Sequence, residues 1–387
     1  MNAPAVQPLP GEKTFPCGSC GSRLVYTPGT TSLRCAHCGN TTILPGSAEQ
    51  VVERDLGQVL AEQVAAAPTL EQKQVRCTGC GAQVALDPQR MSAACPWCGA
   101  AVPTGATSVR SQRPDAILPF TIDRTSAQQR LAEWVTSRWF APAAFTTLTS
   151  PDRLRAVWLP AWTFSCDTVS MYAGERGDDY VVEVEEQVTR DTPEGRKTET
   201  VTRSEVRTAW SFASGMVFVS FRDVLVPAGR TLPRDLAAAL EPWPVAKRQP
   251  FDEGFLAGTE SEVAALGPAD AYTQAKQVMD EQIRSEVHRD IGGDRQRIEW
   301  VRTEHRQPTC TQTLLPVWSA GYRFQDRSYT VLINATTGEI QGSRPWSWGK
   351  ITLTVLVVVA IGAAVWWFTR DLGPAQHHRS YEVESPH

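Results

Sequence analysis

The chain contains 387 residues, enough for about two or three domains, because one hydrophobic core usually serves roughly 100 to 200 residues. Its 38 Lys and Arg residues are balanced by 42 Asp and Glu residues, which excludes a global positive field that would gather nucleic acid. Eight of the ten cysteines lie before residue 99, and only Cys166 and Cys310 follow them. This clustering predicts that the cysteines near the N-terminus form a local site.

The first residues, Met1 to Pro16, do not show the basic start and apolar run that are typical of a secretory signal. We therefore expect the N-terminal part to stay in the cytoplasm. Cytoplasmic thiols are kept reduced, so closely spaced cysteines there are better interpreted as metal ligands than as disulfides.

Two cysteine clusters repeat one spacing. In each cluster a CxxC pair is followed by 14 residues and a second CxxC pair, and glycine follows every pair. Glycine tolerates the positive φ that a metal-binding knuckle requires. The clusters predict zinc ribbons over residues 11–45 and 73–104, with eight metal ligands: Cys17, Cys20, Cys35, Cys38, Cys77, Cys80, Cys95 and Cys98.

Four thiolates satisfy the tetrahedral coordination of Zn²⁺ and leave no open position, so the two Zn²⁺ ions are expected to be structural. Hydrolysis by a metal-bound water is then not expected. Iron is the alternative metal, because four-thiolate sites accept both. His37, inside the second knuckle, is the alternative ligand.

Each ribbon resembles the transcription-factor-IIB type over about 30 residues, which implies fold and metal but leaves nucleic-acid and protein binding both open. The charged residues between Gly11 and Pro45 are Glu12, Lys13, Arg23 and Arg34. Binding to DNA phosphates would require a denser basic set. Protein binding is therefore the preferred interpretation, and nucleic-acid binding is the alternative.

A helical linker is expected over residues 46–72. Between Ala48 and Ala66 the apolar side chains recur near helical spacing, which predicts a short amphipathic helix used for packing or partner contact. These side chains are Val52, Leu56, Val59, Leu60 and Val64.

The largest soluble part, residues 114–345, is expected to be a mixed α+β domain. Helices are predicted at Thr125–Trp139, with Trp134 and Trp139 in the core, and at Pro268–Asp290. Two LPxW segments, at 159–162 and 315–318, suggest related strand entries. The predicted strands include a hairpin of 180–190 with 197–210, strands at 216–226 and 297–306, and a last hairpin of 329–334 with 339–341.

No catalytic set is evident in this domain. Cys166 and Cys310 have no neighbouring His and Asp pattern and are interpreted as core cysteines. His288 and His305 are isolated on a helix and a strand. We therefore predict that the protein is not an enzyme and has no small-molecule substrate; a distant site assembled by the fold is the alternative.

One transmembrane helix is predicted at residues 348–369, followed by a short tail at 370–387. The run from Ile351 to Phe368 carries no charge and spans roughly 27 Å, close to the thickness of the bilayer core. Tryptophans border both of its ends. The flanking charges do not decide the orientation of the helix in the membrane. The expected reduced state of the N-terminal cysteines places that part in the cytoplasm and the tail outside. His377 and His378 in the tail form at most a weak metal site.

Several motifs across the chain are similar to those of bacterial membrane-anchored zinc-ribbon proteins: the CxxCG knuckles, ILPF at 117–120, RWFAP at 138–142, LPAW at 159–162, LPVW at 315–318, NATTGEIQG at 334–342 and RPWSWGK at 344–350. Relatives of this kind occur beside flotillin-like and phage-shock-protein-A-like genes. The resemblance implies protein partners of those classes and a role in envelope maintenance or stress. A second ribbon departs from single-ribbon relatives.

Together these features predict an α+β protein with two N-terminal zinc ribbons, a mixed middle domain and one transmembrane helix. We expect a single-pass protein of the cytoplasmic membrane whose N-terminal domains are cytoplasmic. Its expected function is that of a non-enzymatic zinc-binding adaptor that recruits protein partners to the lipid bilayer. A membrane-tethered nucleic-acid-binding protein, related to transcription or replication, is the alternative.

Overall fold

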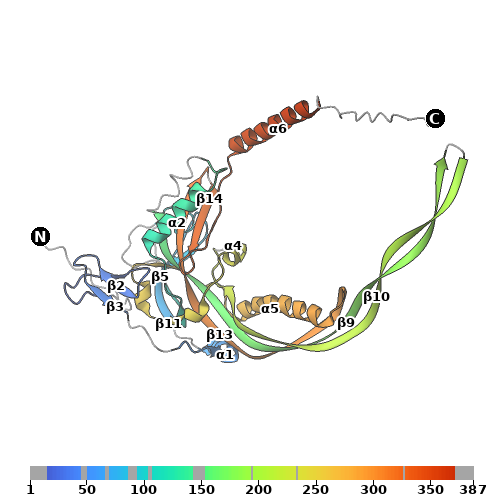
Figure 1. Ribbon diagram of the computed structural model, residues 1–387. Helices are drawn as coiled ribbons and strands as arrows, with labels where there is room; N and C mark the ends of the chain where they lie inside the picture. Colours follow the sequence, from blue (N-terminus) through green and yellow to red (C-terminus); the bar gives the residue numbers. More distant parts are fainter. Residues whose placement is uncertain are drawn as a thin grey trace, which may run out of the picture.

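The computed structural model describes most of the chain (Figure 1). It has the predicted fold class: two four-cysteine sites at the N-terminus, a mixed α+β domain around a large sheet, and one apolar C-terminal helix. The described residues are 15–44, 50–65, 69–85, 94–102, 107–142, 153–192, 195–231, 234–325 and 327–370.

The first ribbon forms a small antiparallel sheet of β1 (Leu24–Tyr26), β2 (Ser32–Cys35) and β3 (Thr41–Ile43). Leu24, Tyr26 and Leu33 are buried, although thirty residues have little core of their own. Their apolar side chains belong to a larger core that also contains residues of the middle domain. The ribbon is therefore packed against the rest of the molecule.

The linker forms a strand and a helix, β4 (Arg54–Asp55) and α1 (Leu56–Ala65). The helix begins later than the predicted Ala48, because Arg54 and Asp55 pair with β13 as a strand. Asp55 Oδ1 then accepts the backbone N–H of Gln58 at 2.9 Å and caps the first turn. Leu56 and Val59 are buried in the same core as α5, whereas Val52 precedes the helix and is exposed.

The second ribbon contributes strands to the main sheet. Its strands β5 (Thr69–Arg76) and β6 (Gln83–Ala85) pair with each other, and β7 (Thr107–Gln112) pairs with β5. β6 also pairs with β12 (Glu260–Glu262), which lies parallel to β9. The ribbon and the middle domain thus share one 12-stranded sheet.

The centre of that sheet consists of three very long antiparallel strands, β9 (Arg155–Thr192), β10 (Gly195–Pro227) and β13 (Arg295–Phe324). Short strands complete it: β8 (Ala116–Ile117) and β11 (Gln249–Pro250) lie on the other side of β13. β9 and β10 extend far beyond β13 as a curved arm (Figure 1). The predicted hairpin is confirmed, with Thr192 opposite Gly195.

The two LPxW segments lie inside strands, which corrects their prediction as strand entries. Leu159 on β9 faces Leu315 on β13, in the middle of the antiparallel pair. Proline cannot donate to a ladder and is therefore uncommon inside a sheet. Its carbonyl can still accept, however, and Pro160 and Pro316 accept backbone N–H groups at 2.8 and 3.0 Å.

Helix α2 (Arg124–Thr136) is capped by Asp123, whose side chain accepts the N–H of Ser126 at 2.8 Å. Trp134 is buried as predicted. The prediction for Trp139 is wrong: the helix ends before it, and its side chain is 76% exposed. The short helices α4 (Arg234–Ala239), η2 (Val245–Lys247) and η3 (Glu253–Leu256) connect β10 to β12.

Helix α5 (Pro268–Ile291) confirms the second predicted helix and lies on the concave side of the arm (Figure 1). Proline occupies its first turn, and Gly292 ends it at φ 66°, a conformation that glycine adopts without strain. One face is buried against β9, β10 and β13 through residues at helical spacing: Ala271, Ala275, Met279, Ile283 and Val287.

The C-terminal elements are the hairpin of β14 (Arg327–Asn334) with β15 (Ile340–Gly342), which confirms the last predicted hairpin, and helix α6 (Trp348–Arg370). Within α6 the stretch Trp348–Phe368 is long and apolar enough to cross a membrane, and none of it is buried. Lys350 Nζ donates to the carbonyls of Trp139 and Ala141 at 3.1 and 2.8 Å, so the start of the helix is attached to the domain.

Candidate metal centres

Each cysteine pair is held in the same knuckle. In the first knuckle, the N–H of Gly21 donates to the carbonyl of Cys17 at 2.8 Å, and the N–H of Cys17 donates to the carbonyl of Ser22 at 2.6 Å. The same two bonds recur in the other three knuckles. The glycine after each pair has a φ between 69° and 77°, which explains why glycine is present at all four positions.

The knuckles meet in pairs and bring four sulfurs together. In the first ribbon, Cys17 Sγ lies 3.5 Å from Cys38 Sγ, and Cys20 Sγ lies 3.6 Å from Cys35 Sγ. In the second ribbon the corresponding distances are 3.5 Å, from Cys77 to Cys98, and 3.7 Å, from Cys80 to Cys95. All sulfurs of a cluster lie within 4.8 Å of one another.

These distances fit zinc. A tetrahedral ion with Zn–S bonds of about 2.3 Å separates its sulfurs by roughly 3.8 Å. Disulfides would require about 2.05 Å, and all ten cysteines are free. Each cluster can therefore bind one Zn²⁺ ion. His37 is not in the ligand cluster, which among the described residues consists of cysteines alone.

Local hydrogen bonds favour the thiolate form of two cysteines in the first ribbon. The backbone N–H groups of Ser19 and Cys20 lower the pKa of the Cys17 thiol to about 6. The N–H groups of Cys38 and His37 lower the pKa of Cys35 in the same way. Metal ligation requires thiolates, so the knuckle backbone prepares both sulfurs for a cation.

The first site is attached to the middle domain by aromatic packing. The ring of Tyr26 lies 5.2 Å from that of Phe255 and 6.0 Å from that of Trp158. The N–H of Tyr26 also donates to the carbonyl of Ala257 at 2.8 Å. Burial of the Tyr26 ring, together with these contacts, holds one edge of the ribbon against the sheet.

The second site lies deeper. Cys77, Cys95 and Cys98 are buried in a core that includes side chains of β9, β13 and β14. Ser319 Oγ donates to the carbonyl of Pro96 at 2.6 Å. Gly99 and Gly321 approach so closely that a Cβ on Gly99 would lie 2.7 Å from the carbonyl oxygen of Gly321. The knuckle is thus in direct backbone contact with β13.

The remaining candidate residues form no further metal cluster among the described residues. Cys166 and Cys310 are buried, as predicted for core cysteines, and burial raises the pKa of Cys166 to about 11 and that of Cys310 to about 12. His288 lies on α5 and His305 on β13, where burial lowers the pKa of His305. His377 and His378 lie outside the described residues.

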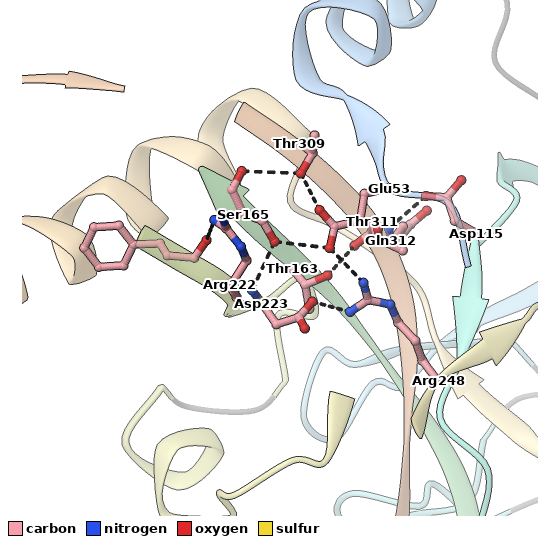
Figure 2. A network of polar contacts seen from close by, with 11 residues as sticks. Glu53, Asp115, Thr163, Ser165, Arg222, Asp223, Arg248, Thr309, Thr311 and Gln312 are labelled. Carbon is pink, nitrogen blue, oxygen red and sulfur yellow. Dashed lines mark hydrogen bonds and ion pairs between the residues drawn. The ribbon is translucent and has the colours of Figure 1, made fainter. Parts of the chain in front are cut away.

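Sequence reasoning missed a polar network that joins the linker to the three long strands (Figure 2). Arg248, whose side chain is only 9% exposed, forms ion pairs with Asp223 on β10 and Glu53 in the linker. Glu53 also accepts hydrogen bonds from Ser165 on β9 and Thr309 on β13. No spacing rule could have found it, because Glu53 and Arg248 are 195 residues apart.

The network coincides with bulges on both sides of β9. The register of β10 shifts between Phe221 and Val224, and that of β13 shifts between Arg306 and Thr309. Asp223 and Gln307, inside these bulges, have positive φ values of 54° and 46°. Bulges bend and twist a strand, so the network stabilises the bulged region of the three long strands.

Replacing Glu53 by glutamine tests this network. Burial opposes ionisation of Glu53, but the hydroxyls of Thr309 and Ser165 and the guanidinium of Arg248 outweigh it and lower its pKa from 4.5. An acid with a lowered folded-state pKa stabilises the fold above its unfolded pKa, and this contribution disappears as the pH falls through the folded value. We expect Glu53→Gln to lower the unfolding free energy by about 1 kcal/mol at pH 7, after allowance for partial exposure.

The loss of unfolding free energy is measured by urea unfolding of the full chain in detergent. Native and variant chains are compared at each pH, so that acid release of zinc affects both. Glu62→Gln, on an exposed residue of α1, is the matched control and should leave stability unchanged. A loss for Glu53→Gln that persisted undiminished at pH 3 would contradict the assignment.

The chain is similar to known proteins in two respects. Residues 17–40, which contain the first four-cysteine site, match the LSD1 zinc finger family. The transcription-factor-IIB type stays a resemblance of the sequence. No solved structure matches the chain.

The "Uncharacterized protein YdjG" of Bacillus subtilis (strain 168) is 24% identical over 261 residues, which are 62% of this chain and 65% of that protein. The match thus covers less than two thirds of the relative's length. Together with the geometry of the eight sulfurs, the finger match supports zinc ribbons as the chemistry of this N-terminal region.

Proposed function

We propose that this protein is a membrane-anchored, zinc-stabilised adaptor that holds partner proteins at the cytoplasmic membrane without catalysing a reaction. The observation that carries the proposal is the distal part of the arm, residues 180–192 and 195–207. Among the described strands none pairs with β9 beyond Gly177 except β10, so this ribbon exposes both faces and both edges. It adds nothing to a core and extends away from the body (Figure 1).

A two-stranded ribbon is only marginally stable alone in water, which makes a long exposed one a natural binding element. Its strands carry apolar side chains among the charges, including Tyr180, Val181 and Val206, which are 50, 66 and 60% exposed. Glu183 and Glu185 alternate with Val182 and Val184. A partner that adds a strand to either edge would satisfy the backbone and cover these side chains.

The zinc sites support a structural rather than a catalytic use of the metal. Four thiolates leave no coordination position for water or substrate. The second site is also packed against β13, so the metal stabilises the body from which the arm extends. In this proposal the ribbons support the binding surface and do not themselves form a separate recruiting module.

The helix α6 supports the membrane location. An apolar helix of this length with no buried surface would be costly in water and favourable in a bilayer. With the N-terminal thiols reduced, the body and the arm would lie on the cytoplasmic side. Partners of flotillin-like or phage-shock-protein-A-like type are those that the sequence resemblance suggests.

Shortening the arm tests the proposal. Tyr180 and Arg207 face each other, so residues 181–206 can be replaced by an Asn-Gly turn that closes the hairpin. We expect the shortened chain to remain in the membrane with two zinc ions bound. It should lose the proteins that the native chain captures from detergent extracts of its host. Partner recovery by mass spectrometry should fall at least about 10-fold.

The control is Cys38→Ser, which damages the first zinc site and leaves the arm intact. If it loses the partners while the shortened arm retains them, the ribbons are the recruiting modules and the proposal is wrong. Capture of the same proteins by both native and shortened chains would also overturn it.

A further inference from the structure

The outer edge of β10 is open for most of its length. Among the described residues, β9 is the one strand that pairs with β10, which runs for 33 residues. Proteins usually protect such edges with charges, prolines or short strands, because an open edge pairs with other strands. Beyond Arg207 toward the tip, β10 has this protection in Arg196, Glu199, Arg203 and Glu205.

The segment from Thr208 to Phe221 lacks that protection. It reads TAWSFASGMVFVSF and contains no charged residue and no proline, and it is bounded by Arg207 and Arg222. Aromatic and β-branched residues with serine give it a high tendency to pair as a strand. An unprotected stretch of this length on an exposed edge would aggregate unless a defined partner covered it.

An apolar patch adjoins this edge. Phe212 and Phe218 are 73 and 70% exposed, and Met216 between them is 48% exposed. Met171 on β9 lies opposite Met216 and is also 48% exposed. Because side chains alternate along a strand, these residues share one face. Val217 points to the other face, where it is buried in the core that contains α5.

The segment is self-complementary when it runs antiparallel to itself. With Gly215 opposite Gly215, Phe212 of one copy faces Phe218 of the other, and the reverse pair forms as well. Ser214 then faces Met216, and residues 209–221 pair throughout. Gly215 lies near the middle of the charge-free segment, so this register covers almost all of it. A twofold axis therefore fits this edge better than an unrelated strand.

We propose that two copies of this chain pair through β10 around Gly215 and form one continuous sheet of β13, β9 and β10 from each copy. The backbone groups of both open edges are satisfied by this pairing. Cross-strand aromatic pairs bring the four exposed phenylalanines into contact and cover part of their surface. The distal halves of the arms remain unpaired and project from the dimer, so this inference goes beyond the adaptor role and does not depend on it.

The first test is the mass of the full chain, purified in detergent and measured by light scattering with correction for bound detergent. We expect a dimer for the native chain. Phe212→Glu/Phe218→Glu should raise the dimer dissociation constant by about 100-fold or more, because it removes both central aromatic pairs and places four charges in the interface.

The matched control is Val181→Glu/Val206→Glu, which changes two residues of similar exposure that face each other on the distal ribbon. It should remain dimeric. A native chain that is monomeric at every concentration, or a dimer that withstands the phenylalanine changes, overturns the proposal.

The register is tested by distances between nitroxide labels on cysteines that replace exposed serines of β10. Ser211 in the two copies would be eight residues apart along the pair and Ser220 ten, so their backbones should be separated by roughly 27 and 34 Å. Buried Cys166 and Cys310 and the zinc ligands should not be labelled, as the chain without added cysteine will show. Distances that fit another register, or no defined distance at either position, contradict pairing around Gly215.

Discussion

Replacing Cys95 by serine is expected to unfold the middle domain together with the second zinc site. Structural zinc contributes about 10–16 kcal/mol in isolated fingers, as much as the whole stability of a typical domain. Cys95 is buried in the same core as Val157 and Val317 of the central strands. Loss of the metal would therefore remove support from the sheet itself.

The measurement is denaturant unfolding of the full chain in detergent, followed by tryptophan fluorescence, because Trp158, Trp162 and Trp318 are fully buried in the sheet. Native chain should show a cooperative transition, and Cys95→Ser should show none. Zinc content, measured by a metal-release assay, should fall from two ions to one or fewer. A cooperative transition of native amplitude in the variant would show that the domain folds without its second metal.

Two other cysteines provide controls. Cys166→Ser changes a buried cysteine that is not a ligand, so both ions should stay bound and stability should fall by only about 1–3 kcal/mol. Cys38→Ser changes an exposed ligand of the first ribbon, whose three strands form their own sheet. It should release one ion and leave the transition of the middle domain detectable.

Trp158→Ala should lower the free energy of unfolding by about 3–5 kcal/mol. Its side chain is completely buried at the junction of the first ribbon and the sheet, with ring centroids 4.8 Å from Phe120 and 6.0 Å from Tyr26. Its Nε1 donates to Thr259 Oγ1 at 3.0 Å. The substitution leaves a large cavity and removes the donor to the Thr259 hydroxyl, which keeps its own bond to the carbonyl of Phe255 at 3.1 Å. The ribbon also loses part of the surface against which it packs.

Hydrogen exchange tests whether the first ribbon loosens from the sheet. The N–H of Tyr26, bonded to Ala257, should lose protection in Trp158→Ala, while both zinc ions remain bound. Trp158→Phe, which keeps an aromatic ring but loses the hydrogen bond, should lower stability by a smaller amount. Equal stability of native and Trp158→Ala chains would contradict the assignment of this residue to the shared core.

Features that depend on neighbouring residues could be predicted from the sequence. The knuckle glycines reveal the metal sites because a CxxCG turn closes on itself through local bonds. Helix α5 follows from the spacing of its buried face, and α6 from the length of an uncharged apolar run. The hairpin of β9 with β10 follows from the turn-forming residues in the sequence between them.

Other features were missed or misplaced because they depend on contacts between distant segments. The linker helix starts at Leu56 instead of Ala48 because β13 pairs with the two preceding residues. Trp139 repeats the helical spacing of α2, but the helix ends at Thr136 and leaves the ring exposed. The side chains of Arg248 and Glu53 gave no local sign of their ion pair, since a charge on a loop is normally solvated.

The sequence by itself determined the eight metal ligands, the apolar helix and the principal turns, because each follows from bond geometry or hydrophobicity within a short segment. Only the tertiary structure decided that the second ribbon shares the main sheet, that both metal sites pack against the central strands, and that β9 and β10 continue into a projecting arm. Those outcomes depend on which strand edges meet, and strand pairing between distant segments is governed by the burial of the whole core rather than by any local pattern.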